Sequence, residues 1–200
     1  MKRKLFLLLC ALPLTGWAQT RKFEHTLFGG VGLQMNKHSY LGDKSLETGI
    51  CGRLGYGLNC YLTPNLSIMP GANLRFTLEQ SEQKGSSLDS GPGRGLTFAD
   101  LPVLLQYHVR GRRGGLVVGL GPVFSFCLDN TRSVSTDESP FTNPNRRVVR
   151  RFNLALQPSL LYEQGHFRYG IEAYVGLLKV DDFCPDTRMY DLSAVLHYRF

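Results

Sequence analysis

Ser193 and His197 are the residue types of a nucleophile and its general base, and both fall on one face of a predicted strand. Such a pair would suggest a serine hydrolase that modifies lipids. Four residues along a strand span about 13 Å, so these two side chains cannot share a hydrogen bond without a partner from another strand. A lipid substrate would also meet the opposite, apolar face of that strand. We therefore predict that the chain is not an enzyme.

A larger set of charged side chains falls on the polar faces of predicted strands, where both signs occur together. The set is Glu24, Arg53, Arg75, Glu79, Arg168, Glu172, Asp191, His197 and Arg199. Arg53 and Arg75 belong to neighbouring strands, and Glu172 and Asp191 to two others. An unpaired charge is costly in a narrow interior, so we expect ion pairs that fill it. A polar conduction path is the alternative.

A basic cluster precedes the sixth predicted strand and consists of Arg146, Arg147, Arg150 and Arg151. Guanidinium groups bind phosphates through two parallel hydrogen bonds, so the cluster could hold lipopolysaccharide. A solvated basic run beside a membrane is an equally good interpretation. The pattern predicts no metal ion and no cofactor.

The cysteines have no metal-ligand spacing. Cys51 and Cys60 are separated by an odd number of residues on one strand, so they face opposite sides and cannot form a disulfide. Cys127 could pair with Cys184 or Cys51 in an oxidising compartment, but small apolar residues are the simpler interpretation.

The N-terminus has the pattern of an export signal. Lys2, Arg3 and Lys4 precede an apolar run from Leu5 to Gly16, and small residues at Gly16 and Ala18 suit a cleavage site. We predict a signal peptide over residues 1–18 and one domain over 19–200. The net charge of +7 falls to +4 without the three basic residues, and nothing in it requires nucleic acid.

The chain after residue 22 alternates between apolar and polar residues, which is typical of β-strands. About eight strands are expected, and each reaches the length that a tilted strand needs to cross a bilayer. They cover residues 23–36, 50–62, 66–79, 100–108, 116–126, 152–162, 167–177 and 190–200. The fold class predicted is therefore all-β, an antiparallel up-and-down transmembrane barrel of eight strands.

Short and long connections alternate along the chain. Tight turns are expected at 63–65, 110–114 and 163–165, and long polar loops at 37–47, 80–94, 129–149 and 179–188. Short periplasmic turns and long extracellular loops are typical of outer-membrane barrels in Gram-negative bacteria, with both termini in the periplasm.

Alternation alone does not decide which face lines the lumen, because a soluble barrel would place its apolar face inside. Three features favour an apolar exterior: glycines on the polar faces, aromatic residues near strand ends, and the final alternating strand with Tyr198 and Phe200. A terminal aromatic residue at such a place is typical of strands that barrel-insertion machinery recognises.

Residues 99–107, with the sequence ADLPVLLQY, resemble the acidic, proline-containing strand of the PorT-like outer-membrane β-barrel proteins of Bacteroidetes. Residues 121–123 and 66–71 are similar to the flanking strands of that family. Asp100 and Gln106 stand where the family usually has Glu and a basic residue. The resemblance implies an eight-stranded barrel in the outer membrane and a possible place in secretion, but little about activity.

The expected function is a structural, adhesive or assembly role, in which the barrel anchors and the loops contact lipopolysaccharide or other envelope proteins. A barrel that binds or passes a small solute is the second hypothesis, and a lipid-modifying enzyme is the third.

Overall fold

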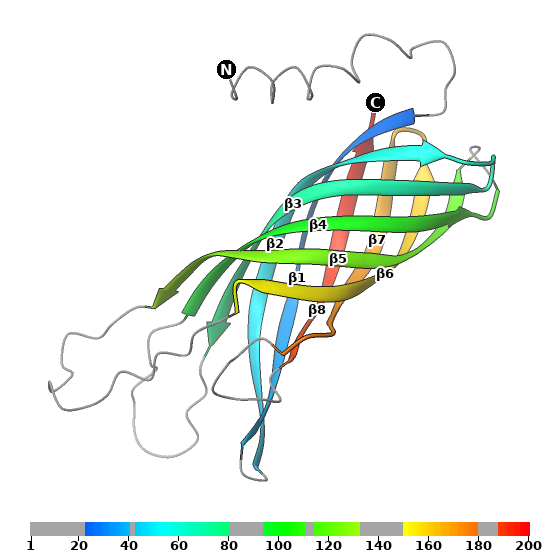
Figure 1. Cartoon of the computed structure of the whole chain (residues 1–200). Coiled ribbons are helices and arrows are strands. Elements are labelled where there is room, and N and C mark those ends of the chain that lie inside the picture. Colours follow the sequence, from blue (N-terminus) through cyan, green and yellow to red (C-terminus); the bar gives the residue numbers. More distant parts are fainter. Residues whose placement is uncertain (1–22, 41–42, 81–93, 111–113, 133–149, 180–187) are drawn as a thin grey trace, which may run out of the picture.

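The computed structural model describes residues 23–40, 43–80, 94–110, 114–132, 150–179 and 188–200. It contains the strands β1 (Phe23–Tyr40), β2 (Asp43–Tyr61), β3 (Leu66–Gln80), β4 (Arg94–His108), β5 (Gly115–Arg132), β6 (Phe152–Gln164), β7 (Phe167–Gly176) and β8 (Arg188–Arg199). Consecutive strands pair antiparallel, and β1 also pairs with β8, which closes the barrel (Figure 1). The predicted fold class is confirmed, whereas the predicted signal peptide lies outside the described residues.

The barrel closes where β1 meets β8. His25 N donates to Phe200 O at 3.2 Å, and Phe200 N donates to His25 O at 3.0 Å. The tight turns after β2 and β6 lie at this same end, which we name the turn end; the opposite end is the loop end (Figure 1). Closure satisfies the backbone groups that an open sheet would leave unpaired at its edges.

The apolar residues of the alternating strands point outward, as predicted. Leu54 is 68% exposed and Leu120 is 51% exposed, while Arg75 is only 1% exposed. An apolar exterior around a charged interior inverts the usual distribution in a protein that folds in water. In the described part of the chain, no helix is long and apolar enough to cross a membrane.

Glycines on the inner faces allow neighbouring strands to approach closely. A Cβ atom on Gly121 would lie 2.0 Å from Val103 O, and one on Gly170 would lie 2.1 Å from Leu160 O. Both distances are far below van der Waals contact, so the close approach of the neighbouring strands requires glycine at these positions.

The expected loop over residues 37–47 is wrong. β1 continues to Tyr40 and β2 begins at Asp43, with pairs such as Lys37↔Leu46 between them (Figure 1). Similarly, β5 continues to Arg132, beyond the predicted boundary at 129. Backbone hydrogen bonds between two antiparallel strands do not depend on an apolar face, so the ladder continues where the alternation has ended.

Candidate functional site in the lumen

Arginines and carboxylates from five strands meet in the middle of the lumen. Arg53 Nη2 donates to Asp191 Oδ1 at 2.6 Å, and its Nη1 donates to Glu172 Oε2 at 3.2 Å. Arg75 Nε donates to Asp100 Oδ2 at 2.8 Å, and its Nη1 donates to Asp191 Oδ2 at 3.3 Å. Asp191 therefore joins the two arginines through its two oxygens.

His197 stands at the end of this series. Its Nε2 lies 3.3 Å from Glu172 Oε1, and its ring stacks on Phe28 with centroids 5.0 Å apart. Asp100, Arg75, Asp191, Arg53 and Glu172 thus alternate in sign, with His197 beside Glu172, and we name these six residues the central charge chain. Alternation of sign gives each buried charge an opposite neighbour, as burial requires.

Arg75 also packs between two aromatic rings. Its Cζ lies 4.6 Å from the centroid of Phe98 and 4.1 Å from that of Tyr174. The Tyr174 hydroxyl is in turn hydrogen-bonded to Ser125 Oγ at 2.9 Å. Cation–π contact and ion pairing together hold the guanidinium in one position across the lumen.

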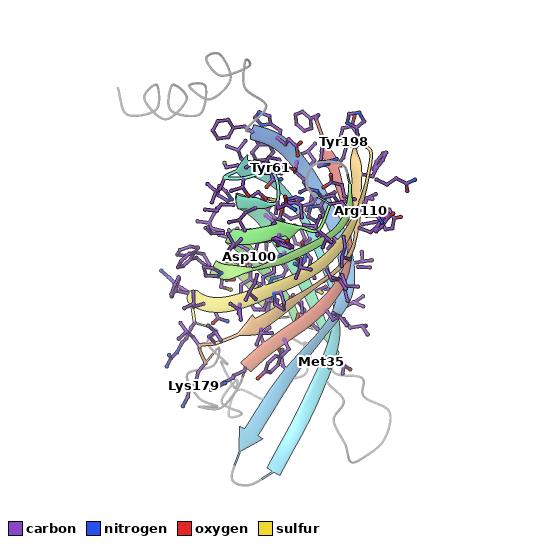
Figure 2. The ribbon with its side chains drawn as sticks, turned by 90° about the vertical axis from the view of Figure 1, so that its right-hand side faces the viewer. Met35, Tyr61, Asp100, Arg110, Lys179 and Tyr198 are labelled. Carbon is purple, nitrogen blue, oxygen red and sulfur yellow. The ribbon has the colours of Figure 1, made fainter. Side chains whose placement is uncertain are left out.

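A second group of charges fills the lumen near the turn end. We name Glu24, Tyr61, Glu163, Arg168 and Arg199 the turn-end cluster. Arg168 Nε donates to Glu163 Oε2 at 2.7 Å, and Arg199 Nη1 lies 3.0 Å from Glu163 Oε1. Glu24 accepts from Tyr61 at 2.9 Å and from Arg199 at 3.1 Å. Figure 2 shows Tyr61 toward this end, with Met35 and Lys179 toward the other.

Apolar side chains fill the remaining levels of the lumen, which the sequence analysis did not predict. One cluster contains Leu96, Phe98, Val123, Ala155, Tyr174 and Met189, and a smaller one contains Val117, Leu161 and Val195. Each of these residues is at most 5% exposed. The described interior is therefore a packed core with charged levels, as expected for a barrel of eight strands.

The structure places eight of the nine charged residues named from the sequence in these two groups; the side chain of Glu79 lies outside the described residues. Sequence reasoning missed Asp100 and Glu163 as partners. Glu163 is in phase with Asn153, Gln157 and Ser159 along β6, so the same alternation could have found it. Asp100 alternates with Leu101 and Val103 along β4, so the same alternation could have found it as well.

Ser193 and His197 have separate partners. Ser193 Oγ accepts from Arg53 Nη2 at 3.1 Å and lies 3.5 Å from Cys51 Sγ, whereas His197 faces Glu172. A different pair is in contact: Ser67 Oγ and His108 Nε2 are 2.9 Å apart. Both residues are at most 1% exposed, so this pair is part of the lumen packing and has no surface that a substrate could reach.

The cysteines and the basic cluster complete the sequence-based candidates. Cys51, Cys60 and Cys127 are free thiols, so the alternative of a disulfide between Cys51 and Cys127 is wrong. Cys184 lies outside the described residues.

Arg150 and Arg151 are exposed beside the start of β6. Arg146 and Arg147 lie outside the described residues. Within the described ranges, no group of three His, Cys, Asp or Glu could hold a metal ion.

A closed antiparallel barrel with an apolar exterior and a charged, filled interior defines the class of small outer-membrane barrels. Residues 17–182 match the family described as outer membrane protein beta-barrel domain, and the chain belongs to this family. It is thus a small outer-membrane barrel protein of the Gram-negative type.

Two solved structures are similar to the chain at low sequence identity, and the first shows the same fold. Neisserial surface protein A (NspA) is 13% identical, with a TM-score of 0.53 over 87% of this chain and 97% of that one. Ail, the attachment invasion locus protein of Yersinia pestis, is also 13% identical, with a TM-score of 0.45 over 90% and 99%. No curated protein matches the chain significantly.

Proposed function

We propose that this protein is a closed membrane anchor, with a lumen sealed by ion pairs and a surface-exposed end that contacts partners. The central charge chain carries the proposal. The side chains of Arg53, Arg75, Glu172 and Asp191 are each at most 3% exposed, and their charges are bound to one another. A conduction path would need polar groups that water or a solute can reach.

A conductance measurement tests the anchor against the small-solute barrel. The purified protein is inserted in planar bilayers, and single-channel current is recorded with the full chain and with Arg53→Ala. We expect no discrete channels from the unsubstituted protein, because paired charges and apolar side chains fill the lumen of the described barrel. Stable, uniform channels that Arg53→Ala alters in size would overturn the proposal in favour of a pore.

In this proposal the turn end faces the periplasm and the loop end faces outward. Short turns between neighbouring strands at the turn end support this orientation, because short periplasmic turns are general in bacterial barrels. Accessibility of single cysteines to an impermeant maleimide on intact cells tests it. Labelling at residue 150 without labelling at residue 110 is expected, and the reverse pattern would contradict it.

Lipopolysaccharide is the partner proposed for the basic cluster. Arg150 and Arg151 support it because they are exposed where β6 begins at the loop end. Arg150→Ala with Arg151→Ala should weaken binding to lipopolysaccharide, most clearly at low salt. Arg110→Ala, an exposed arginine in the turn after β4, is the control and should leave binding unchanged.

We also propose that Tyr198 and Phe200 present the last strand to the barrel-insertion machinery. Both side chains are outward and exposed, and their rings stack with centroids 6.3 Å apart. Phe200→Ala should slow assembly in cells while leaving spontaneous refolding in detergent unchanged. A narrower PorT-like role, beside other envelope proteins in secretion, depends on the ADLPVLLQY segment and on residues 66–71 and 121–123.

A further inference from the structure

Four of the eight ladders of the barrel are interrupted, and each interruption contains a proline. The registers jump from Gly57↔Gly71 to Cys60↔Ile68, from Pro70↔Val103 to Asn73↔Asp100, from Pro102↔Val123 to Leu105↔Leu120, and from Leu156↔Val175 to Ser159↔Glu172. Continuing each register places Pro70, Pro102, Pro122 and Pro158 in the missing pairs. The other four ladders have no such jump.

Proline chemistry explains why each residue interrupts one ladder only. Proline has no N–H, so it cannot donate to the strand that its nitrogen faces. The N and C=O of one residue face the same neighbouring strand, so the ladder on the other side is bonded through the adjacent residues and is unaffected. The β5–β6 ladder accordingly remains continuous although it contains Pro122 and Pro158. Opposite Pro70, the carbonyl of Leu58 accepts instead from Cys60 Sγ at 3.7 Å, a weak replacement.

Three of the interruptions adjoin one another in β2–β3, β3–β4 and β4–β5. Residues 69–72 of β3 and 101–104 of β4 therefore each lack a paired residue on one neighbouring strand. We name these two segments the seam. Backbone groups without partners are expensive in a bilayer, so the wall is least stable here.

Both sides of the seam are apolar. Leu101 and Val103 point outward and are 44% and 38% exposed, whereas Met69 and Leu104 point inward and are at most 1% exposed. Along β4, Leu104 lies between Asp100 of the central charge chain and Gln106, which accepts from Arg168 of the turn-end cluster. The inward side chains of the seam itself therefore carry no charge.

The inner side of the seam is filled by a flexible side chain. Met69 has three rotatable bonds, and its Sδ accepts a weak hydrogen bond from Gln106 Nε2 at 3.6 Å. Glycines lie beside it: Gly57 on β2 pairs with Gly71, two residues along β3 from Met69, and a Cβ atom on Gly57 would lie 3.2 Å from Met69 Cγ. Rotation of Met69 would vacate a narrow apolar space directly behind the weakest part of the wall.

We propose that the wall opens sideways at the seam and that the space filled by the Met69 side chain receives one alkyl chain of a surrounding lipid. The ligand class follows from the chemistry of the seam: an uncharged, unbranched chain, which in a bilayer surrounds the exposed Leu101 and Val103, takes the place of the Met69 side chain. The charged groups above and below confine it to this level. The site is separate from the loop-end contacts of the proposed anchor.

Tryptophan quenching by brominated acyl chains tests the entry of lipid. Trp17 is the single tryptophan of the chain, so Trp17→Phe gives a silent background. Leu104→Trp then places an inward reporter at the seam, and Phe28→Trp places a matched inward reporter on β1, whose two ladders are continuous. In bilayers of brominated phosphatidylcholine, we expect the emission of Leu104→Trp to be lost and that of Phe28→Trp to be largely retained.

Restoring the missing donors should close the seam. Adding Pro70→Ala, Pro102→Ala and Pro122→Ala to the Leu104→Trp protein should return its emission to the level of Phe28→Trp. Equal quenching of the two reporters, or quenching that the three alanines leave unchanged, would overturn the proposal.

Amide hydrogen exchange on the protein without tryptophan substitutions provides an independent measurement, in case the reporters impair folding. The remaining amides of residues 69–72 and 101–104 should exchange about tenfold faster than those of residues 192–195 in the continuous β7–β8 and β1–β8 ladders. Equal protection of the two regions would show that the wall does not open at the prolines.

Discussion

Arg53 and Asp191 are 138 residues apart in sequence and form the shortest ion pair of the central charge chain, with Nη2 and Oδ1 2.6 Å apart. Inside the lumen the pair connects β2 to β8, and Asp191 also connects to β3 through Arg75. Since β1 separates β2 from β8 in the wall, the interaction braces strands that do not pair through their backbones. The charges thus stabilise the closed barrel from inside.

Removal of one partner of this chain should be strongly destabilising. Arg53→Met leaves Asp191 and Glu172 buried with less compensation, which costs about 3–5 kcal/mol in comparable buried pairs. The free energy of unfolding in urea, measured on the protein refolded in vesicles, checks this value. Arg110→Met, at an exposed turn position, is the control and should change stability by less than about 0.5 kcal/mol. Equal effects of the two substitutions would contradict the account.

Alanine at the close approaches of the wall should also impair folding. Gly121→Ala would place Cβ 2.0 Å from Val103 O, and the backbone must move to relieve the clash. We expect a loss of about 1–3 kcal/mol or more, as for other overpacked sites. In the matched control Gly52→Ala, the nearest atom to the new Cβ is 3.9 Å away, so little change is expected. The heat-sensitive band shift in SDS gels reports the folded fraction of each variant.

A charged side chain on the outer surface should lower the stability of the barrel, and the loss should increase with the depth of the side chain in the bilayer. Leu120→Arg places a guanidinium on the outward face of β5, away from both ends of the strand, and should destabilise the barrel by about 2–4 kcal/mol in a bilayer. Leu62→Arg lies beside the turn after β2, so its cost should be at most about 1 kcal/mol. Urea titration of both variants in vesicles gives the difference between their free energies of unfolding. A soluble carrier with the same faces would tolerate both arginines equally.

The cysteines should react according to their faces. Cys51 is buried beside Ser193, so it should react with N-ethylmaleimide only after unfolding. Cys60 points outward and should react in the folded protein with this small apolar reagent. Peptide mass mapping assigns the label to each residue. Rapid labelling of Cys51 in the folded barrel would show that water reaches the middle of the lumen.

Much of the fold could be predicted because a barrel wall has a period of two. The alternation of Leu54 and Tyr56 with Arg53 and Gly55 identifies both the strand and its two faces, and seven similar stretches give the strand number. Strand ends were predicted less well. The ladder between Lys37 and Leu46 depends on backbone pairing, which leaves no signal in the pattern of side chains.

The sequence by itself determined that charged residues of both signs share the lumen, because their phase along each strand is fixed by the pleat. Only the tertiary structure decided which charge meets which: register and closure bring Arg53 to Glu172 and Asp191, and Glu163 to Arg168 and Arg199. The same holds for the prolines. Their positions are visible in the sequence, but which neighbour loses a hydrogen bond depends on the strand that each ring nitrogen faces. Pairing across strands is a long-range property, so local alternation cannot specify it.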